Sequence, residues 1–236
     1  MNPFSLSGIL IGISSFFLGI FIFWKSQHNK VNRIWSIFCF FVAIFGFGSF
    51  AVGSTLDPDK GLFWWKIAYI GIIFIPVLYY HFVSAFLQLK SKIFLYLLYL
   101  YGFFFLIIEW SHYANLFFGP ENITLFFNSL FFVYPPTPLF MFFVVSWFGI
   151  IVYSHVLLYD YFKNSLGIRR EQIKYFFIAT ATGFAGGSTC FLPCFGINFY
   201  PYFNFAVPLY PAIITYAIVV HRLMDIKMVM RRYSVY

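Results

Sequence analysis

Few side chains in this sequence could carry chemistry, and they stand singly within long apolar segments. Lys66, His81 and His155 are the ionisable ones, and an ionisable group inside an apolar segment is a functional candidate by default. Lys66 could extend its charged end to a polar surface or pair with an acid such as Glu109. A neutral histidine can hydrogen-bond between helices, and we favour that role for His81 and His155 over ligand or proton binding. Pro76 is a further candidate because it can interrupt a helix.

No motif for catalysis or metal binding accompanies these residues. The sequence has no phosphate loop, no pair of histidines at zinc-binding spacing and no nucleophile elbow. We therefore predict no catalytic residue, no metal site and no cofactor, and we expect the chain not to be an enzyme. Cys190 and Cys194 are one helical turn apart with Pro193 between them. They could form a disulfide, but we favour two small packing residues.

The composition excludes most classes of protein. Of the 236 residues, 62% are hydrophobic and 9% are charged, against roughly 25% charged in an ordinary soluble domain. So few charges leave too little polar surface for a soluble fold, and so many apolar residues exclude intrinsic disorder. Three cysteines are too few for a disulfide scaffold. We therefore predict an all-α membrane protein whose surroundings are the lipid bilayer.

Seven stretches of the chain are suited to cross a membrane, which takes about 20 mostly apolar residues per helix. They cover residues 4–24, 34–54, 62–87, 93–110, 139–162, 176–195 and 203–221. Trp64, Trp65 and Lys66 open the third stretch. Residues 126–133 precede a cluster of prolines, and we expect them to form an interfacial or re-entrant piece. We predict a seven-helix transmembrane region over residues 1–221, followed over 222–236 by a short basic tail or the start of a linker.

The basic residues indicate the orientation. The net charge is +8, and thirteen of the fifteen lysines and arginines lie in residues 25–33, 88–92, 163–174 and 222–236. With seven spans these segments share one side of the membrane, and basic loops stay in the cytoplasm. The N-terminus is then outside and the C-terminus cytoplasmic, in a multi-pass protein of the inner cell membrane. Since the charge is spread over four short segments, we expect contacts with anionic lipid headgroups and not with nucleic acid.

Aromatic residues near the ends of the predicted spans are typical of an interfacial belt. We therefore expect Trp24, Trp35, Trp64, Trp65 and Trp110 to lie at the membrane surfaces. The 38 phenylalanines give no comparable positional signal, because Phe serves as well as Leu in lipid.

Several short stretches of the chain resemble those of one family in their order and spacing. They are residues 32–35 with Phe38, then 62–71, 74–76, 80–82, 170–175, 186–187, 208–211, 216–219 and 221–226. Together they resemble the seven-transmembrane N-terminal region of bacterial sensor histidine kinases. The same region also precedes diguanylate cyclases and other signalling domains.

The resemblance implies a sensory input module of a bacterial signal-transduction system, such as a two-component system. The candidate sensing residues are Trp64, Trp65, Lys66, Pro76, His81 and His155, and the candidate output residues are Arg222, Asp225, Arg231 and Arg232. In that family a kinase core follows the membrane region, whereas this sequence stops soon after Arg222, so we expect no kinase activity in this polypeptide. We expect either a truncated kinase or a stand-alone sensor that acts on a separate cytoplasmic kinase or cyclase, and a homodimer could form.

The residues leave one alternative open, a small transporter or channel. Pro76, Pro193, Pro208 and Pro211 could break helices around a transported substrate. Against this interpretation, the sequence shows no internal repeat of the kind found in many transporters, and the spans hold few polar groups. A membrane-embedded enzyme is disfavoured because the acids and histidines do not cluster.

Overall fold

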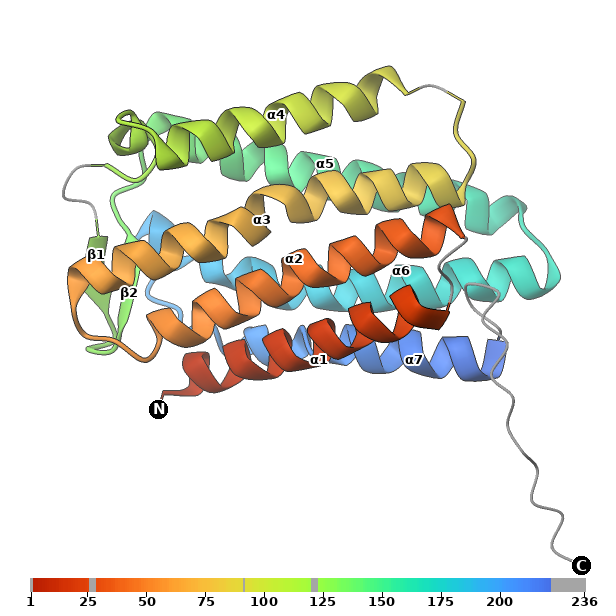
Figure 1. The fold of residues 1–236 in the computed structure, drawn as a ribbon, viewed down its shortest axis with the longest axis horizontal. Coiled ribbons are helices and arrows are strands. Elements are labelled where there is room, and N and C mark those ends of the chain that lie inside the picture. The colour runs from red at the N-terminus through yellow and green to blue at the C-terminus, as the bar shows by residue number, and fades with distance from the viewer. Residues whose placement is uncertain (1, 26–28, 91, 120–122, 222–236) are drawn as a thin grey trace, which may run out of the picture.

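The protein is a bundle of long helices, seen here in a computed structural model that describes residues 2–25, 29–90, 92–119 and 123–221 (Figure 1). The described residues form seven α-helices, α1 (Pro3–Lys25), α2 (Lys30–Val52), α3 (Pro58–Phe86), α4 (Ile93–Trp110), α5 (Pro138–Asn164), α6 (Gly167–Ser188) and α7 (Leu209–His221). Successive helices run in opposite directions (Figure 1). The bundle therefore has two ends. We call the end where α1 begins the hairpin end, after the β-hairpin described below, and the end where α1 finishes with Lys25 the basic end.

Six of these helices, α1 to α6, are long and apolar enough to cross a membrane. The predicted spans match α1 to α5 closely, and the fourth, 93–110, has the bounds of α4. The sixth was expected at 176–195, but the helix already begins at Gly167 and continues to Phe195 through two 3₁₀ turns, Thr189–Phe191 and Pro193–Phe195.

The seventh helix begins later than predicted. In place of a helix from residue 203, the chain forms a 3₁₀ helix, Tyr202–Ala206, and α7 starts only at Leu209. Pro208 and Pro211 explain the break, because proline has no N–H to donate within a helix and is tolerated in the first turn. The described part of α7 has 13 residues.

Local sequence sets where α2, α3 and α5 begin. The Asn29 side chain accepts hydrogen bonds from the backbone N–H groups of Val31 and Asn32, which caps α2. Asp57 caps α3 in the same way, and Thr137 caps α5. In α3 and α5 a proline follows the cap, where its missing N–H has no intrahelical partner to lose.

A β-hairpin covers one end of the bundle, so the expectation of a purely α-helical chain is incomplete. Strands β1 (Ile123–Phe126) and β2 (Leu130–Val133) pair antiparallel, and all four residues of β2 are buried. The Trp65 indole donates to the Phe131 carbonyl (2.5 Å), and the Asn2 amide donates to the Ser129 carbonyl (3.1 Å). The expectation of an interfacial or re-entrant piece over residues 126–133 included no strands. Pairing of the strands satisfies their backbone groups, and the two hydrogen bonds fix the hairpin against α1 and α3.

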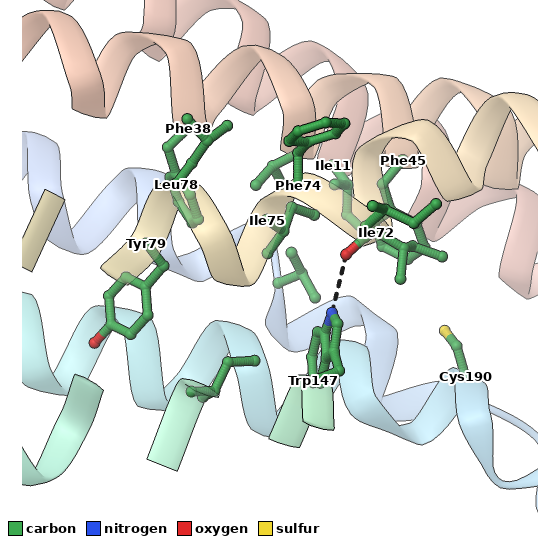
Figure 2. Packing of buried hydrophobic residues seen from close by; sticks show 14 of the residues in the cluster. Ile11, Phe38, Phe45, Ile72, Phe74, Ile75, Leu78, Tyr79, Trp147 and Cys190 are labelled. Carbon is green, nitrogen blue, oxygen red and sulfur yellow. Dashed lines mark hydrogen bonds between the residues drawn. The ribbon is translucent and has the colours of Figure 1, made fainter. Parts of the chain in front are cut away.

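The helices form a closed ring around a core. Each helix contacts the next in the order α1, α2, α3, α5, α6 and α7, and α7 contacts α1 again. Helix α4 packs on the outer side of α3. Helix α3 is consequently the most buried of the long helices. Figure 2 shows part of this core, with labelled side chains from α1 (Ile11), α2 (Phe38, Phe45), α3 (Ile72, Phe74, Ile75, Leu78, Tyr79), α5 (Trp147) and the 3₁₀ turn after α6 (Cys190).

The interfacial belt predicted for the tryptophans is wrong for two of them. Trp35 is 0% exposed and Trp65 is 3% exposed, and both belong to the core. Trp24, Trp64 and Trp110 are exposed on the bundle, and for them the interfacial position stays a prediction. Trp35 packs against Phe82 of α3, and Trp65 packs against Phe132 of β2. The sequence alone does not place these rings beside the two indoles.

Candidate functional site

A cavity of about 60 Å³ lies inside the ring of helices. Its lining comes from α2 (Phe38, Val42, Phe45), α3 (Trp65, Tyr69, Ile72, Ile75), α5 (Trp147), α6 (Thr180, Gly183, Phe184, Gly187), the 3₁₀ turn after it (Cys190, Phe191), the residue Val207 ahead of α7 and the first turn of α7 (Tyr210). The surface that these residues present is almost entirely apolar. Five of the seven helices meet at this cavity, which makes it the candidate functional site.

Pro76 shapes one wall of the cavity through a hydrogen bond that it cannot make. In a regular helix the N–H of residue 76 would donate to the carbonyl of Ile72, but proline has no N–H. The Trp147 indole of α5 donates to that carbonyl instead, at 3.0 Å (Figure 2). A side chain of α5 thus occupies a position in the hydrogen-bond ladder of α3, and both Ile72 and Trp147 line the cavity.

A polar cluster of Tyr79, His155 and Thr180 lies beside the cavity and joins α3, α5 and α6. The Tyr79 hydroxyl is 2.9 Å from Thr180 Oγ1 and 3.2 Å from His155 Nε2, and Thr180 Oγ1 is 3.2 Å from that nitrogen. His155 Nδ1 is 2.9 Å from the Ile151 carbonyl, which only accepts, so this nitrogen carries the proton of the neutral ring.

Each hydrogen-bonding group in this cluster can be assigned as a donor or an acceptor. Thr180 donates its one hydroxyl proton to the Phe176 carbonyl at 2.6 Å. The Tyr79 hydroxyl is then the donor within the cluster, and Nε2 of the neutral His155 ring is an acceptor. Every member has a partner, so the cluster ties three helices together without an ionised group.

The start of α7 is anchored to the rest of the ring by two buried polar residues. The hydroxyl of Tyr210 donates to Ser15 Oγ of α1 at 3.0 Å, and its ring packs edge-on against Trp35 and Phe38. Ahead of α7, the Asn204 amide donates to Ser7 Oγ of α1 at 2.8 Å. Tyr210 therefore lines the cavity with its ring while its hydroxyl fixes α7 to α1.

A second feature of note is a buried carboxyl at the hairpin end. Glu109, near the end of α4, is 0% exposed, and neither carboxylate oxygen has a hydrogen-bond partner among the described residues. The Lys66 ammonium lies over the Trp110 ring, 5.8 Å from its centroid. Burial of an unpartnered carboxyl is unfavourable, and the pairing with Lys66 left open from the sequence is not among the ion pairs of the described residues.

The structure brings together three of the six predicted sensing residues. Trp65 lines the cavity, Pro76 shapes its wall through the Ile72 carbonyl, and His155 belongs to the adjoining polar cluster. The other three lie elsewhere: Trp64 is exposed against Phe63, Lys66 is at the hairpin end, and His81 bonds to the Tyr99 hydroxyl of α4 at 2.8 Å. The predicted output residues Arg222, Asp225, Arg231 and Arg232 lie outside the described residues.

The important residues that sequence reasoning missed are Trp147, Thr180 and Tyr210. A signal existed for Trp147, since Pro76 leaves the Ile72 carbonyl in need of a donor, but nothing in the sequence says which helix supplies it. Thr180 and Tyr210 look like ordinary residues of apolar spans. Their partners are 101 and 195 positions away in the chain.

The cysteines pack and do not pair. Cys39, Cys190 and Cys194 are all free and buried. The Cys194 thiol lies 3.9 Å from the Cys190 carbonyl, within its own segment. The favoured interpretation of two small packing residues agrees with this arrangement. Among the described residues no group of three His, Cys, Asp or Glu side chains is placed to hold a metal ion.

One comparison with known proteins gives a match. The family model described as the N-terminal 7TM region of histidine kinase matches residues 8–227. No curated protein and no solved structure matches the chain. The matched range contains every residue that lines the cavity and every member of the polar cluster beside it.

Proposed function

Because the chain belongs to the family of N-terminal seven-transmembrane regions of histidine kinases, we propose that it is the sensory input module of a bacterial signal-transduction system. Its stimulus acts on the packing of the helices around the central cavity. The response leaves through α7 and the residues that follow it.

The proposed topology has seven spans, with the N-terminus outside and the C-terminus in the cytoplasm of the inner membrane. Six helices of spanning length support it, as does the alternation that sends α7 toward the basic end (Figure 1). The excess of lysine and arginine at that end favours the cytoplasmic side.

A single observation carries the proposal, namely that the cavity reaches the start of α7. Val207 and Tyr210 line the cavity together with residues of α2, α3, α5 and α6. A change in the size or contents of the cavity would therefore act directly on the helix that leads out of the membrane region. Tightly packed interiors respond to such a change by switching between discrete arrangements.

Tyr210 is the residue through which the change would pass. Its ring is at the cavity, its hydroxyl holds Ser15 of α1, and it is 3% exposed. If α7 moves relative to α1, the hydrogen bond between Tyr210 and Ser15 must stretch or break. The two arrangements of α7 would then differ by about the free energy of one buried hydrogen bond, about 1 kcal/mol.

The output partner in this proposal is a cytoplasmic kinase or cyclase, joined to the same polypeptide or separate from it. Arg222, Asp225, Arg231 and Arg232 would make the connection. A homodimer is part of the proposal, since the membrane module would then present two copies of α7 to a dimeric partner.

The test joins residues 1–236 to a histidine kinase core and measures autophosphorylation in lipid nanodiscs. Tyr210→Phe keeps the ring and removes the hydroxyl that donates a hydrogen bond to Ser15. We expect a change in basal autophosphorylation of roughly fivefold, which corresponds to about 1 kcal/mol in a two-state equilibrium. Tyr96→Phe is the matched control, because Tyr96 is 67% exposed on α4. Equal output from wild type and both variants would refute a role for Tyr210 in transmission.

A further inference from the structure

The lining of the central cavity leaves very little for a polar ligand to bind. Its polar atoms are engaged elsewhere: Trp65 Nε1 with the Phe131 carbonyl, Trp147 Nε1 with the Ile72 carbonyl, Thr180 Oγ1 with the Phe176 carbonyl and the Tyr210 hydroxyl with Ser15. The Tyr69 hydroxyl is the one further hydroxyl on the described lining, and this residue is buried (2% exposed).

Water is a poor occupant of such a space. The volume of about 60 Å³ is ample for water, which needs roughly 10–15 Å³ by the same kind of measure. However, a buried water needs two to four polar partners, and the lining offers at most one. Cavities with apolar walls instead take up small apolar molecules such as benzene or xenon.

Two glycines of α6 keep the cavity open. A Cβ added to Gly183 would meet Tyr210 atoms no closer than 3.5 Å, and one added to Gly187 would meet Val207 at 3.5 Å. Both are ordinary contact distances, so neither glycine is required for close packing. The neighbouring Gly186 differs, because a Cβ there would lie 2.4 Å from the Phe203 carbonyl oxygen. Gly186 is needed for packing, whereas Gly183 and Gly187 leave space that larger residues could fill.

A route from the bilayer to the cavity passes Phe184. This residue lines the cavity and also a groove between α5 and α6 on the outside of the bundle, with Val152, Val156 and Phe177. The groove is lined almost wholly by apolar atoms, apart from the half-buried His155 ring. A molecule dissolved in the hydrocarbon could therefore reach the cavity sideways when the Phe184 ring changes rotamer.

We propose that the central cavity binds a small, uncharged, apolar molecule that enters from the bilayer between α5 and α6. The molecule has at most one hydrogen-bonding group, which would meet the Tyr69 hydroxyl. Its occupancy sets the position of Tyr210 and so of α7. This last step rests on the sensory function proposed above, whereas the binding itself does not.

Xenon is the probe for binding, with the full chain in nanodiscs and its tryptophans replaced by 5-fluorotryptophan. Trp65 and Trp147 line the cavity, while Trp24 is 73% exposed on α1. As xenon pressure rises, the ¹⁹F resonances of Trp65 and Trp147 should shift to saturation, and that of Trp24 should shift only in proportion to pressure. Proportional shifts at all three tryptophans would overturn the proposal.

Glycine variants separate the cavity from unspecific uptake by lipid. The double variant Gly183→Ala and Gly187→Ala adds two methyl groups to the cavity lining and should abolish the saturable shift. Gly149→Ala, on α5, makes the same change where nothing lies within 4 Å, and it should keep the shift. A saturable shift that survives in the double variant would place xenon elsewhere and overturn the assignment.

The kinase fusion then tests the link to signalling. Xenon and the double glycine variant should each change autophosphorylation, and xenon should lose its effect in the double variant. Saturable binding with unchanged autophosphorylation would refute the cavity as the sensory site. In that case the sensory function itself would still be judged by Tyr210→Phe, so the two failures can be told apart.

Discussion

At the scale of single residues, the hydrogen bond from the Trp147 indole to the Ile72 carbonyl replaces the backbone hydrogen bond that Pro76 cannot donate. A proline within a membrane helix is tolerated only when neighbouring groups satisfy the carbonyl that it leaves free. Here the donor is an indole N–H from another helix, at 3.0 Å. The break in the backbone of α3 is thereby linked to the position of α5.

We predict that Trp147 and Pro76 are energetically coupled. Trp147→Phe leaves the Ile72 carbonyl buried without a donor, which should cost about 1–3 kcal/mol. Pro76→Ala restores a backbone N–H at that position, so in its background the cost of Trp147→Phe should fall by roughly 1 kcal/mol. Unfolding of the four proteins in mixed micelles by increasing SDS measures this double-mutant cycle. Additive effects, within roughly 0.3–0.5 kcal/mol, would mean that Trp147 contributes packing alone.

The sequence indicates which residues are unusual but not which other residues they contact. Pro76, His155 and Trp65 stand out by type and place, and all three prove to lie at or beside the cavity. Their partners do not stand out, because a threonine in an apolar span is one of many until the helices are packed. The burial of Glu109 likewise becomes visible only once the helices are packed.

At the scale of elements, α1 and α2 approach each other unusually closely through glycines. A Cβ added to Gly46 would lie 2.4 Å from the Gly12 nitrogen and 2.8 Å from the Gly8 carbonyl oxygen. Gly8 and Gly12 are four residues apart, the spacing that lets two membrane helices touch through their backbones. Ser36 supports the contact by donating to the Gly19 carbonyl at 2.7 Å.

We predict that Gly46→Ala destabilises the bundle. No real Cβ contact is as short as the one it would create, so α1 and α2 must separate, at a cost of about 1–3 kcal/mol. Gly149→Ala is the matched control, because it makes the same change in α5 where no atom lies within 4 Å. Thermal unfolding in detergent should give a lower midpoint for Gly46→Ala and no decrease for Gly149→Ala. Equal midpoints would show that the two helices can part without penalty.

Elements were easier to predict than residues, with two instructive exceptions. Hydropathy locates helices well because a membrane-spanning helix satisfies its own backbone. It fails at residues 203–208, where prolines delay α7, and at 123–133, where the chain forms a hairpin. Short strands at the end of a membrane bundle give no recognisable hydropathy pattern, because their burial depends on contacts with helix ends. One such contact is the hydrogen bond from Trp65 of α3 to Phe131.

At the scale of the whole molecule, charge and buried thiols together make the orientation accessible to experiment. The hairpin end carries the turn between α4 and β1, and the basic end carries the turn between α5 and α6 (Figure 1). All three native cysteines are buried, with at most 5% exposure. A membrane-impermeant maleimide should therefore leave the wild-type chain unlabelled, and a new exposed cysteine should report its own side of the membrane.

We predict that Asn115→Cys is labelled on intact cells and that Leu166→Cys is labelled only after the cells are opened. Asn115 is exposed at the hairpin end, and Leu166 is 82% exposed at the basic end. The expected result follows from basic loops staying in the cytoplasm. The reverse pattern would place the N-terminus inside. Labelling of both positions on intact cells would contradict an odd number of spans between them, and with it the passage of α5 across the membrane.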